Sequence, residues 1–330
     1  MANNRIYYAN QQVAFKKVGG SWTVAHGVQS IGIATSFSLE QAFELGQLAI
    51  YENIEGIPEV ECTITKVLDG YELLWRLATS AASTNVLVDR AQTETFVALG
   101  IWADTEDGTS GVPQQHLEMS GMAVTNISYS MPVDGNFTES ITLVGSDKQW
   151  DANKCASAWD TDVYNGQFAD NDDAPIGTGG INRRENFKPH GGGSTLPAEV
   201  TGDHIQSVEI SADLSRESLF ELGTRKPYAR VVNFPAEVTC SFEILAIDGD
   251  GVRALADGCS PVKPCPGVAD NTQDSTIIVA LCEGTIINLG TKNRLSSVNY
   301  GGGDAGGGNA TVTYTYTTYN DFTVDHLTQS

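Results

Sequence analysis

Five aspartates between residues 160 and 173 could bind a calcium ion, because carboxylate oxygens are the ligands that calcium prefers. An EF-hand loop places acidic or amide ligands at alternate positions, with a central glycine and a closing glutamate. That order is missing here, so we expect a solvated loop and no bound metal. The five are Asp160, Asp162, Asp170, Asp172 and Asp173.

Other residue types of chemical interest also lack the spacing that their chemistry needs. The glycine-rich run at residues 301–308 has no Gly-Lys-Ser/Thr sequence to cradle a phosphate. The histidines form no His-x-x-x-His pair, and with no Cys-x-x-Cys the chain offers no zinc scaffold; we expect His26 and His204 to pack or cap. A Gly-x-Ser-x-Gly nucleophile elbow is absent as well. The sequence therefore predicts no catalytic residues, no cofactor and no metal, and a protein that is not an enzyme. The histidines are His26, His116, His190, His204 and His326.

Cysteines divide into two kinds. Cys62 and Cys240 occupy the same place in alternating, strand-like runs and are expected to be small core residues. Cys259 and Cys265 lie in a turn-rich loop, where a disulfide could close a short ring. The sequence shows no secretory signal, which favours free thiols, but both states stay open.

Charge and hydropathy bound the function further. The 330 residues carry a net charge of −22 with the acidity spread along the chain, and a protein that holds nucleic acid needs a basic stripe. Specific DNA binding is therefore not expected, although an acidic surface suits a protein that DNA must slide past. On the charge alone, high solubility is the better explanation. Nothing resembles a membrane span, which needs about 20 apolar residues.

The sequence of residues 28–58 returns without a gap as residues 205–235. Eleven of the 31 aligned pairs are identical, most densely at Phe-Glu-Leu-Gly. A period this long indicates two related domain-sized lobes rather than a solenoid. We divide the chain into an N-terminal arm (1–25) that only a neighbour could fix, a first domain (26–150), a linker or surface insertion (151–200) and a second domain (201–330).

Alternation of apolar and polar residues predicts mostly strands. Residues 31–37 and 60–64, and their repeats 208–214 and 238–244, are typical of half-buried strands. Hairpins are expected at 127–143, around an Asp-Gly turn, and at 298–316. Between the paired strands, the Phe-Glu-Leu-Gly block predicts a single helical turn ended by glycine. Short helices are expected at 71–83 and 251–257.

With these patterns in place, the chain resembles the tail tube proteins of tailed bacteriophages. The similarity lies in residues 206–244, with Lys226-Pro-Tyr-Ala-Arg and Phe234-Pro-Ala-Glu-Val, and in residues 28–71 and 126–145. It implies an all-β fold with minor α: two tandem β-sandwich or barrel-like tail-tube domains, each with a short flanking helix. The second copy departs from the pattern at residues 259–274 and 301–308, where the surfaces of the two lobes are expected to differ.

The resemblance also implies a role and a set of partners. Two lobes in each chain would let three chains form a homotrimeric, pseudo-hexameric ring, and rings would stack into a channel for viral DNA, which passes without specific binding. Other partners would be the terminator, the baseplate or tip, the tape measure and, in a contractile tail, the sheath. The protein would be located in the phage tail of a virion that is assembled in the host cytoplasm, without membrane insertion. We assign the two repeat blocks to the assembly interface: Phe43, Glu44, Leu45, Gly46, Phe220, Glu221, Leu222 and Gly223.

Two other classes of function remain open. A carbohydrate-binding or adhesive β-sandwich of a virion or cell surface would also be acidic and rich in strands. Such a protein should cluster aromatic residues on loops, whereas the five tryptophans are scattered. A hydrolase on a β-scaffold would need paired carboxylates in a cleft, which a sequence can neither locate nor exclude.

Overall fold

The chain folds into strands with very little helix. The computed structural model describes residues 5–46, 48, 50–80, 87–106, 113–151, 179–189, 193–200, 204–247, 249, 274–303 and 308–326. Within them the helices are α1 (Leu74–Ala78) and α2 (Leu87–Ala91), with 3-10 turns at Tyr8–Asn10 and Arg184–Asn186. Neither helix is long and apolar enough to cross a membrane. The predicted class, all-β with minor α, is confirmed.

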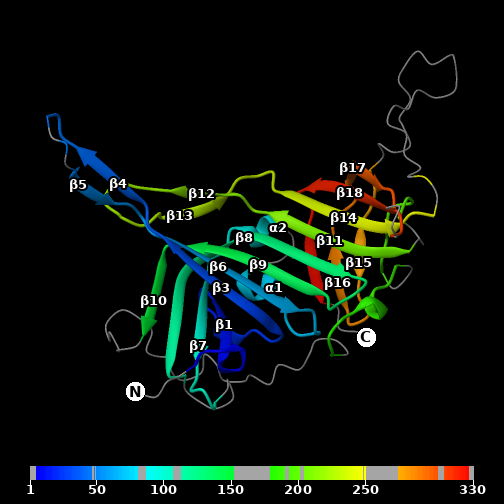
Figure 1. Ribbon diagram of the computed structural model, residues 1–330, viewed down its shortest axis with the longest axis horizontal. Coiled ribbons are helices and arrows are strands. Elements are labelled where there is room, and N and C mark those ends of the chain that lie inside the picture. The colour runs from blue at the N-terminus through cyan, green and yellow to red at the C-terminus, as the bar shows by residue number, and fades with distance from the viewer. Residues whose placement is uncertain are drawn as a thin grey trace.

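Eight antiparallel strands form the central sheet, which runs through the whole molecule (Figure 1). Their spatial order is β3-β6-β9-β8-β11-β14-β18-β17, so that strands from the two sequence repeats share one sheet. The bounds are β3 Val28–Ser36, β6 Glu59–Val67, β9 Thr138–Gly145, β8 Gln115–Pro132, β11 Ile205–Asp213, β14 Glu237–Leu245, β18 Thr311–Tyr319 and β17 Arg294–Gly301.

One face of this sheet forms the hydrophobic core. Val60, Cys62 and Ile64 alternate along β6 and are all buried, as are Val238 and Cys240 along β14, because successive side chains of a strand point to opposite faces. Burial raises the pKa of the Cys62 thiol to about 12. The prediction that these two cysteines are core residues is confirmed.

The sequence repeat is also a repeat of strand order. The four strands β3-β6-β9-β8 of the first lobe correspond to β11-β14-β18-β17 of the second. Bulges recur at matching points: between Val28 and Ser30 as between Ile205 and Ser207, and between Val124 and Asn126 as between Leu295 and Ser297. Counterparts are therefore 177 residues apart in β3 and β11 and 171 apart in β8 and β17.

Each repeat block forms a β-hairpin, and the predicted helical turn is wrong. β4 (Leu39–Phe43) pairs with β5 (Ile50–Glu55), and β12 (Arg216–Leu219) pairs with β13 (Ala229–Val232). Gly46 and Gly223 have φ of +92° and +97° at the hairpin ends, a conformation that glycine adopts without strain. A two-stranded ladder gives these backbones the partners that one isolated helical turn would leave unsatisfied.

A second group of strands extends the first lobe. β7 (Thr95–Ile101) and β10 (Asp147–Asp151) pair with the N-terminal half of β8, and β1 (Gln11–Lys17) joins β7 to β2 (Trp22–Val24). The expectation that only a neighbour could fix residues 1–25 is therefore wrong for residues 11–24, which pair within their own chain. Trp22 and Trp102 anchor a small separate core between these strands.

Smaller elements complete the second lobe, where β15 (Ile278–Ala280), β16 (Thr285–Asn288) and β19 (Thr323–His326) form a sheet. Both predicted hairpins are confirmed, at β8–β9 and β17–β18. The helix expected at 71–83 is shorter, and α2 was not expected. From the region called a linker, residues 179–189 and 193–200 reach the core, where Asn182 and Val200 are buried. The expected helix at 251–257, Cys259, Cys265 and the five aspartates between 160 and 173 lie outside the described residues.

Candidate assembly interface

The central sheet ends in two edges that are related by the repeat. Within the described residues, β3 pairs only with β6, and β17 pairs only with β18. Their counterparts, β11 and β8, pair with each other and join the two lobes. The two edges of one chain thus correspond to the two strands that form its internal joint.

Side chains at these edges are exposed where their counterparts are buried. Tyr300 on β17 is 55% exposed, whereas its counterpart Tyr129 on β8 is 1% exposed. Ile33 on β3 is half-buried, whereas its counterpart Ile210 on β11 is buried. The internal joint therefore covers apolar surface that the two edges leave open, as expected of strands that still lack a partner.

Backbone groups at the edges also point outward. At the internal joint the Leu214 amide donates to the Thr125 carbonyl at 2.8 Å, and the Val133 amide donates to the Gln206 carbonyl at 2.7 Å. Hydrogen-bonded pairs alternate in an antiparallel ladder, so Ile127 and Tyr129 also direct their backbone groups toward β11. Their counterparts on β17, Val298 and Tyr300, direct theirs away from the chain.

The eight residues predicted from the repeat lie at or next to the ends of the two hairpins. Leu45 and Leu222 are fully exposed, at 103% and 104% of the reference value, and Phe43 and Phe220 are also exposed. Figure 1 shows the β4–β5 hairpin reaching beyond the first lobe. The β12–β13 hairpin extends toward the base of the β4–β5 hairpin. An Arg225 guanidinium nitrogen donates to the Gly56 carbonyl oxygen at 3.3 Å and joins the second hairpin to the root of the first. The structure thus separates the two blocks, and their role in assembly stays a prediction.

The β12–β13 hairpin of the second lobe docks on the first lobe through its arginines. The Arg216 guanidinium donates to the carbonyls of Val124 (2.6 Å) and Ala91, and the Arg230 guanidinium donates to the Gly121 carbonyl (3.4 Å). Burial lowers the pKa of Arg216 to about 10. These contacts were not predicted from the sequence. The only available signal was that the second repeat carries arginines where the first has Leu39 and Asn53.

Hydroxyl and acidic side chains cover the sheet face opposite the core, which we call the open face. Hydroxyls there bond to one another, as Thr65 does to Ser140 at 3.1 Å and Ser211 to Thr239 at 2.7 Å. Arg294, at the end of β17, is the one cation among the open-face residues described, and it pairs with Asp274 at 2.7 Å. Other hydroxyl and acidic members are Glu59, Glu61, Thr63, Thr65, Ser128, Ser130, Thr138, Ser140, Thr142, Ser207, Glu209, Ser211, Asp213, Glu237, Thr239, Ser241, Glu243, Thr311, Thr313, Thr315 and Thr317, and the side chains of Val144, Leu245 and Tyr319 lie on the same face.

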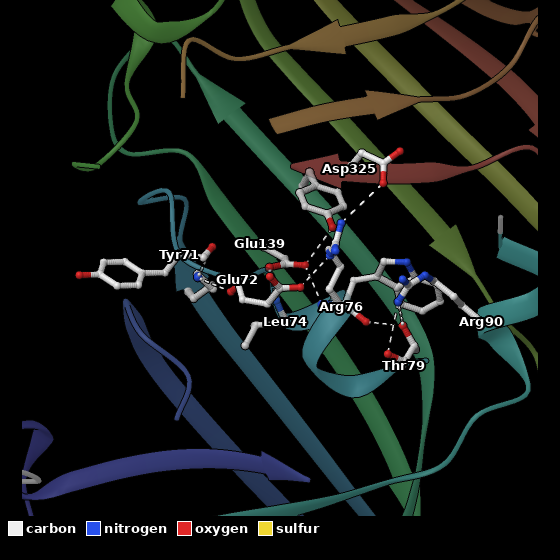
Figure 2. A network of polar contacts seen from close by, with 11 residues as sticks. Tyr71, Glu72, Leu74, Arg76, Thr79, Arg90, Glu139 and Asp325 are labelled. Atoms are coloured by element: carbon white, nitrogen blue, oxygen red, sulfur yellow. Dashed lines mark hydrogen bonds and ion pairs between the residues drawn. The ribbon is translucent and has the colours of Figure 1, made fainter. Parts of the chain in front are cut away.

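A network of ionisable side chains lies beneath α1, where Glu139 is completely buried (Figure 2). Its carboxylate accepts hydrogen bonds from the amides of Leu74 (2.7 Å) and Trp75 (2.9 Å) and from the Tyr129 hydroxyl (2.8 Å). Burial raises the pKa of Glu139, while the charge of Lys66 and the two amides oppose that rise. The carboxylate thus attaches the first turn of α1 to β9.

The same network connects the two lobes. Arg76 on α1 pairs with Glu72 at 2.6 Å and with Asp325 on β19 of the second lobe at 3.5 Å. The ammonium group of Lys66, also buried, donates to the Glu72 carbonyl at 2.9 Å. These bonds attach α1 both to β9 of the first lobe and to β19 of the second lobe.

Replacing Glu139 by alanine should lower the free energy of unfolding by about 3–5 kcal/mol, because the change leaves two buried amides and one buried hydroxyl without their acceptor and removes a negative charge that interacts favourably with Lys66. Urea denaturation monitored by tryptophan fluorescence measures the loss. Glu61→Ala, on the open face, is the control and should change stability by less than about 0.5 kcal/mol. Equal, small effects of both substitutions would show that the network contributes little to stability.

In the part of the chain that the structure describes, no group of three or more histidine, cysteine or acidic side chains is placed to hold a metal ion. His26 stacks on Tyr71, with ring centroids 4.3 Å apart, as its expected packing role requires.

Comparisons with known proteins place few constraints on the chain. No protein-family model matches it, and no curated protein does. Among solved structures, a chain from the cryo-EM structure of the anti-feeding prophage baseplate is similar over 45% of this chain and 96% of that chain. The identity is 10% and the TM-score is 0.28. A likeness this weak carries no weight for fold or function.

Proposed function

We propose that this chain is a structural, non-catalytic subunit of a phage tail tube, and that it assembles by pairing β17 of one copy with β3 of the next. The observation that carries the proposal is the repeat relation of the two sheet edges: the chain exposes both halves of a joint that it already forms once internally. A head-to-tail contact of this kind closes into a ring when the rotation between copies allows it.

The internal joint supplies the register of the proposed one. Ile210 lies opposite Tyr129, and Ala212 lies opposite Ile127. Shifting each residue to its counterpart places Ile33 of one copy opposite Tyr300 of the next, and Thr35 opposite Val298. The ring would then contain one continuous antiparallel barrel, without the open edges that favour uncontrolled aggregation.

Three copies would supply six lobes around such a ring. The count comes from the resemblance to tail tube proteins and from the two lobes in each chain. Stacked rings would form the tube of a virion tail, with the terminator, baseplate or tip and tape measure as further partners.

The open face suits the wall of a channel for DNA. Its carboxylates repel phosphates. The one lysine or arginine in its described part is Arg294, which already pairs with Asp274 and is therefore not available to replace the counterions of a nucleic acid. Hydroxyls that bond to one another offer few groups to hold a passing duplex. The barrel would place this face inward and the helices α1 and α2 outward.

Native mass spectrometry and negative-stain imaging of the purified protein test the proposal together. We expect particles of three chains and hollow rings or tubes as the concentration rises. Monomers that persist at high concentration would contradict the proposal, and binding to a glycan array by such monomers would support the adhesive alternative.

A further inference from the structure

The β12–β13 hairpin docks on a lobe of its own chain, whereas its counterpart, the β4–β5 hairpin, has no such lobe to dock on among the described residues. The β12–β13 hairpin follows β11 and lies on the first lobe, whose β8 pairs with β11. The β4–β5 hairpin follows β3 in the same way, yet among the described residues no lobe of its own chain lies beyond β3. Its large apolar side chains Leu39, Phe43 and Tyr51 are all more than 60% exposed. If β3 pairs with β17 of another copy, the second lobe of that copy lies where this hairpin points.

The charges at the two docking places are arranged in opposite ways. On the first lobe, Arg230 reaches the carbonyl of Gly121, and the nearby Glu94 carboxylate interacts favourably with the charges of Arg216 and Arg230. The counterpart of Gly121 on the second lobe is Lys292, and that of Ala123 is Arg294. The cations thus lie on the hairpin in one case and on the receiving strand in the other.

The receiving strand of the second lobe borders a groove. Lys292, Arg294, Leu295, Glu237, Asp274 and Tyr319 line it, and we call it the receiving groove. Leu295 is the counterpart of Val124, whose carbonyl accepts from Arg216 at the internal joint. The groove therefore lies at the place that a docked hairpin occupies on the first lobe.

We propose that the β4–β5 hairpin docks in the receiving groove of a neighbouring copy, with Glu55 beside Lys292 and Arg294. The inference rests on the proposed ring and names the partner of its hairpin. Glu55 is the counterpart of Val232, which is 5% exposed against the first lobe. In the single chain the Glu55 side chain is 75% exposed and pairs with the exposed Arg225 at 3.5 Å. Docking would bury Glu55 next to two cations.

This arrangement also selects which lobes meet. Residues 39–55 carry four glutamates and no cation, whereas residues 216–232 carry four cations and two glutamates. The acidic hairpin would be repelled by the surface of a first lobe, where Glu94 and Asp147 face the docked arginines and Lys226. Contacts between two first lobes, which would close a dimer instead of a ring, are thereby disfavoured.

Reciprocal charge reversal tests the inference. Lys292→Glu and Glu55→Lys should each raise the protein concentration at half-assembly by about tenfold or more at low salt, because each brings like charges together. The variant that combines both should recover most of the assembly of the unmodified chain. Sedimentation velocity measures the assembled fraction, and circular dichroism verifies that each variant is folded. Lys188→Glu is the control for the change in net charge and should assemble like the unmodified chain.

The outcomes separate this inference from the proposed function. Rings that form normally from the unmodified chain and from both single variants would overturn the hairpin docking and leave the edge pairing in place. A combined variant no better than the single ones would also overturn it, because the two residues would then not face each other. If the unmodified chain forms no rings, both proposals fail.

Discussion

Val298→Pro should abolish ring formation and leave the subunit folded. Val298 directs its backbone toward the free side of β17, so proline would remove an amide that the chain itself does not use. Proline is tolerated on an edge strand when its missing N–H faces solvent. In the ring, each joint would lose one hydrogen bond and bury a carbonyl without a donor, at about 1–3 kcal/mol for each joint. Three joints together cost about 3–9 kcal/mol, which lowers the equilibrium constant for ring closure by about a hundredfold to a millionfold.

Val298→Thr is the matched control, because it keeps the amide and the β-branched shape, and we expect it to assemble. Native mass spectrometry reports the number of chains, and thermal unfolding of the monomer shows whether the proline variant keeps its stability. Rings in the proline variant would exclude β17 as an assembly edge. A proline variant that does not fold would instead show that the Val298 amide is used within the chain, which contradicts the direction inferred here.

Cations on the open face should turn a non-binding channel into one that retains DNA. Glu61 and Glu209 lie on this face in the first and second lobe. Replacing both by lysine changes the net charge by +4 in each chain, or by +12 in a ring of three. Each lysine that reaches a phosphate releases a counterion. We expect assembled variant rings to bind a short fluorescent duplex with an affinity that falls steeply as salt rises, while the unmodified rings show no binding.

A control with the same gain of charge elsewhere separates location from net charge. Glu185→Lys with Glu106→Lys lies outside the central sheet and should leave DNA binding near that of the unmodified rings. Fluorescence anisotropy across a salt series measures both. Equal binding by the two variants would show that the open face is not the surface that DNA meets.

Much of the central sheet is predictable from the sequence, because its strands obey the simplest rule of half-buried sheets. Val60, Cys62 and Ile64 alternate with polar residues, and Asp134-Gly135 specifies a tight turn. The repeat itself predicts two similar lobes. It does not predict that β8 and β11 join them into one sheet, because pairing between strands distant in sequence leaves no local pattern.

Elements outside that sheet were missed for identifiable reasons. β7 is a nearly continuous apolar run, buried on both faces, so it lacks the alternation that marks a strand. Lys66 and Glu139 occupy core positions as charges, which a hydrophobic pattern counts against burial. The sequence Ser-Leu-Glu before Phe43 is typical of a helix start, but this segment forms β4 because it pairs with β5. Counterpart positions such as Arg216 and Leu39 carry different residue types. The structure is needed to see that this difference reflects the docking of the β12–β13 hairpin through Arg216.

The most direct test of the account is an electron cryomicroscopy reconstruction of the assembled protein at a resolution that separates strands. The account predicts a closed ring in which β17 of each copy pairs antiparallel with β3 of the next, with Tyr300 opposite Ile33 and the hydroxyl and acidic face lining the channel. A ring held together by other surfaces, with β3 and β17 still unpaired, would contradict it.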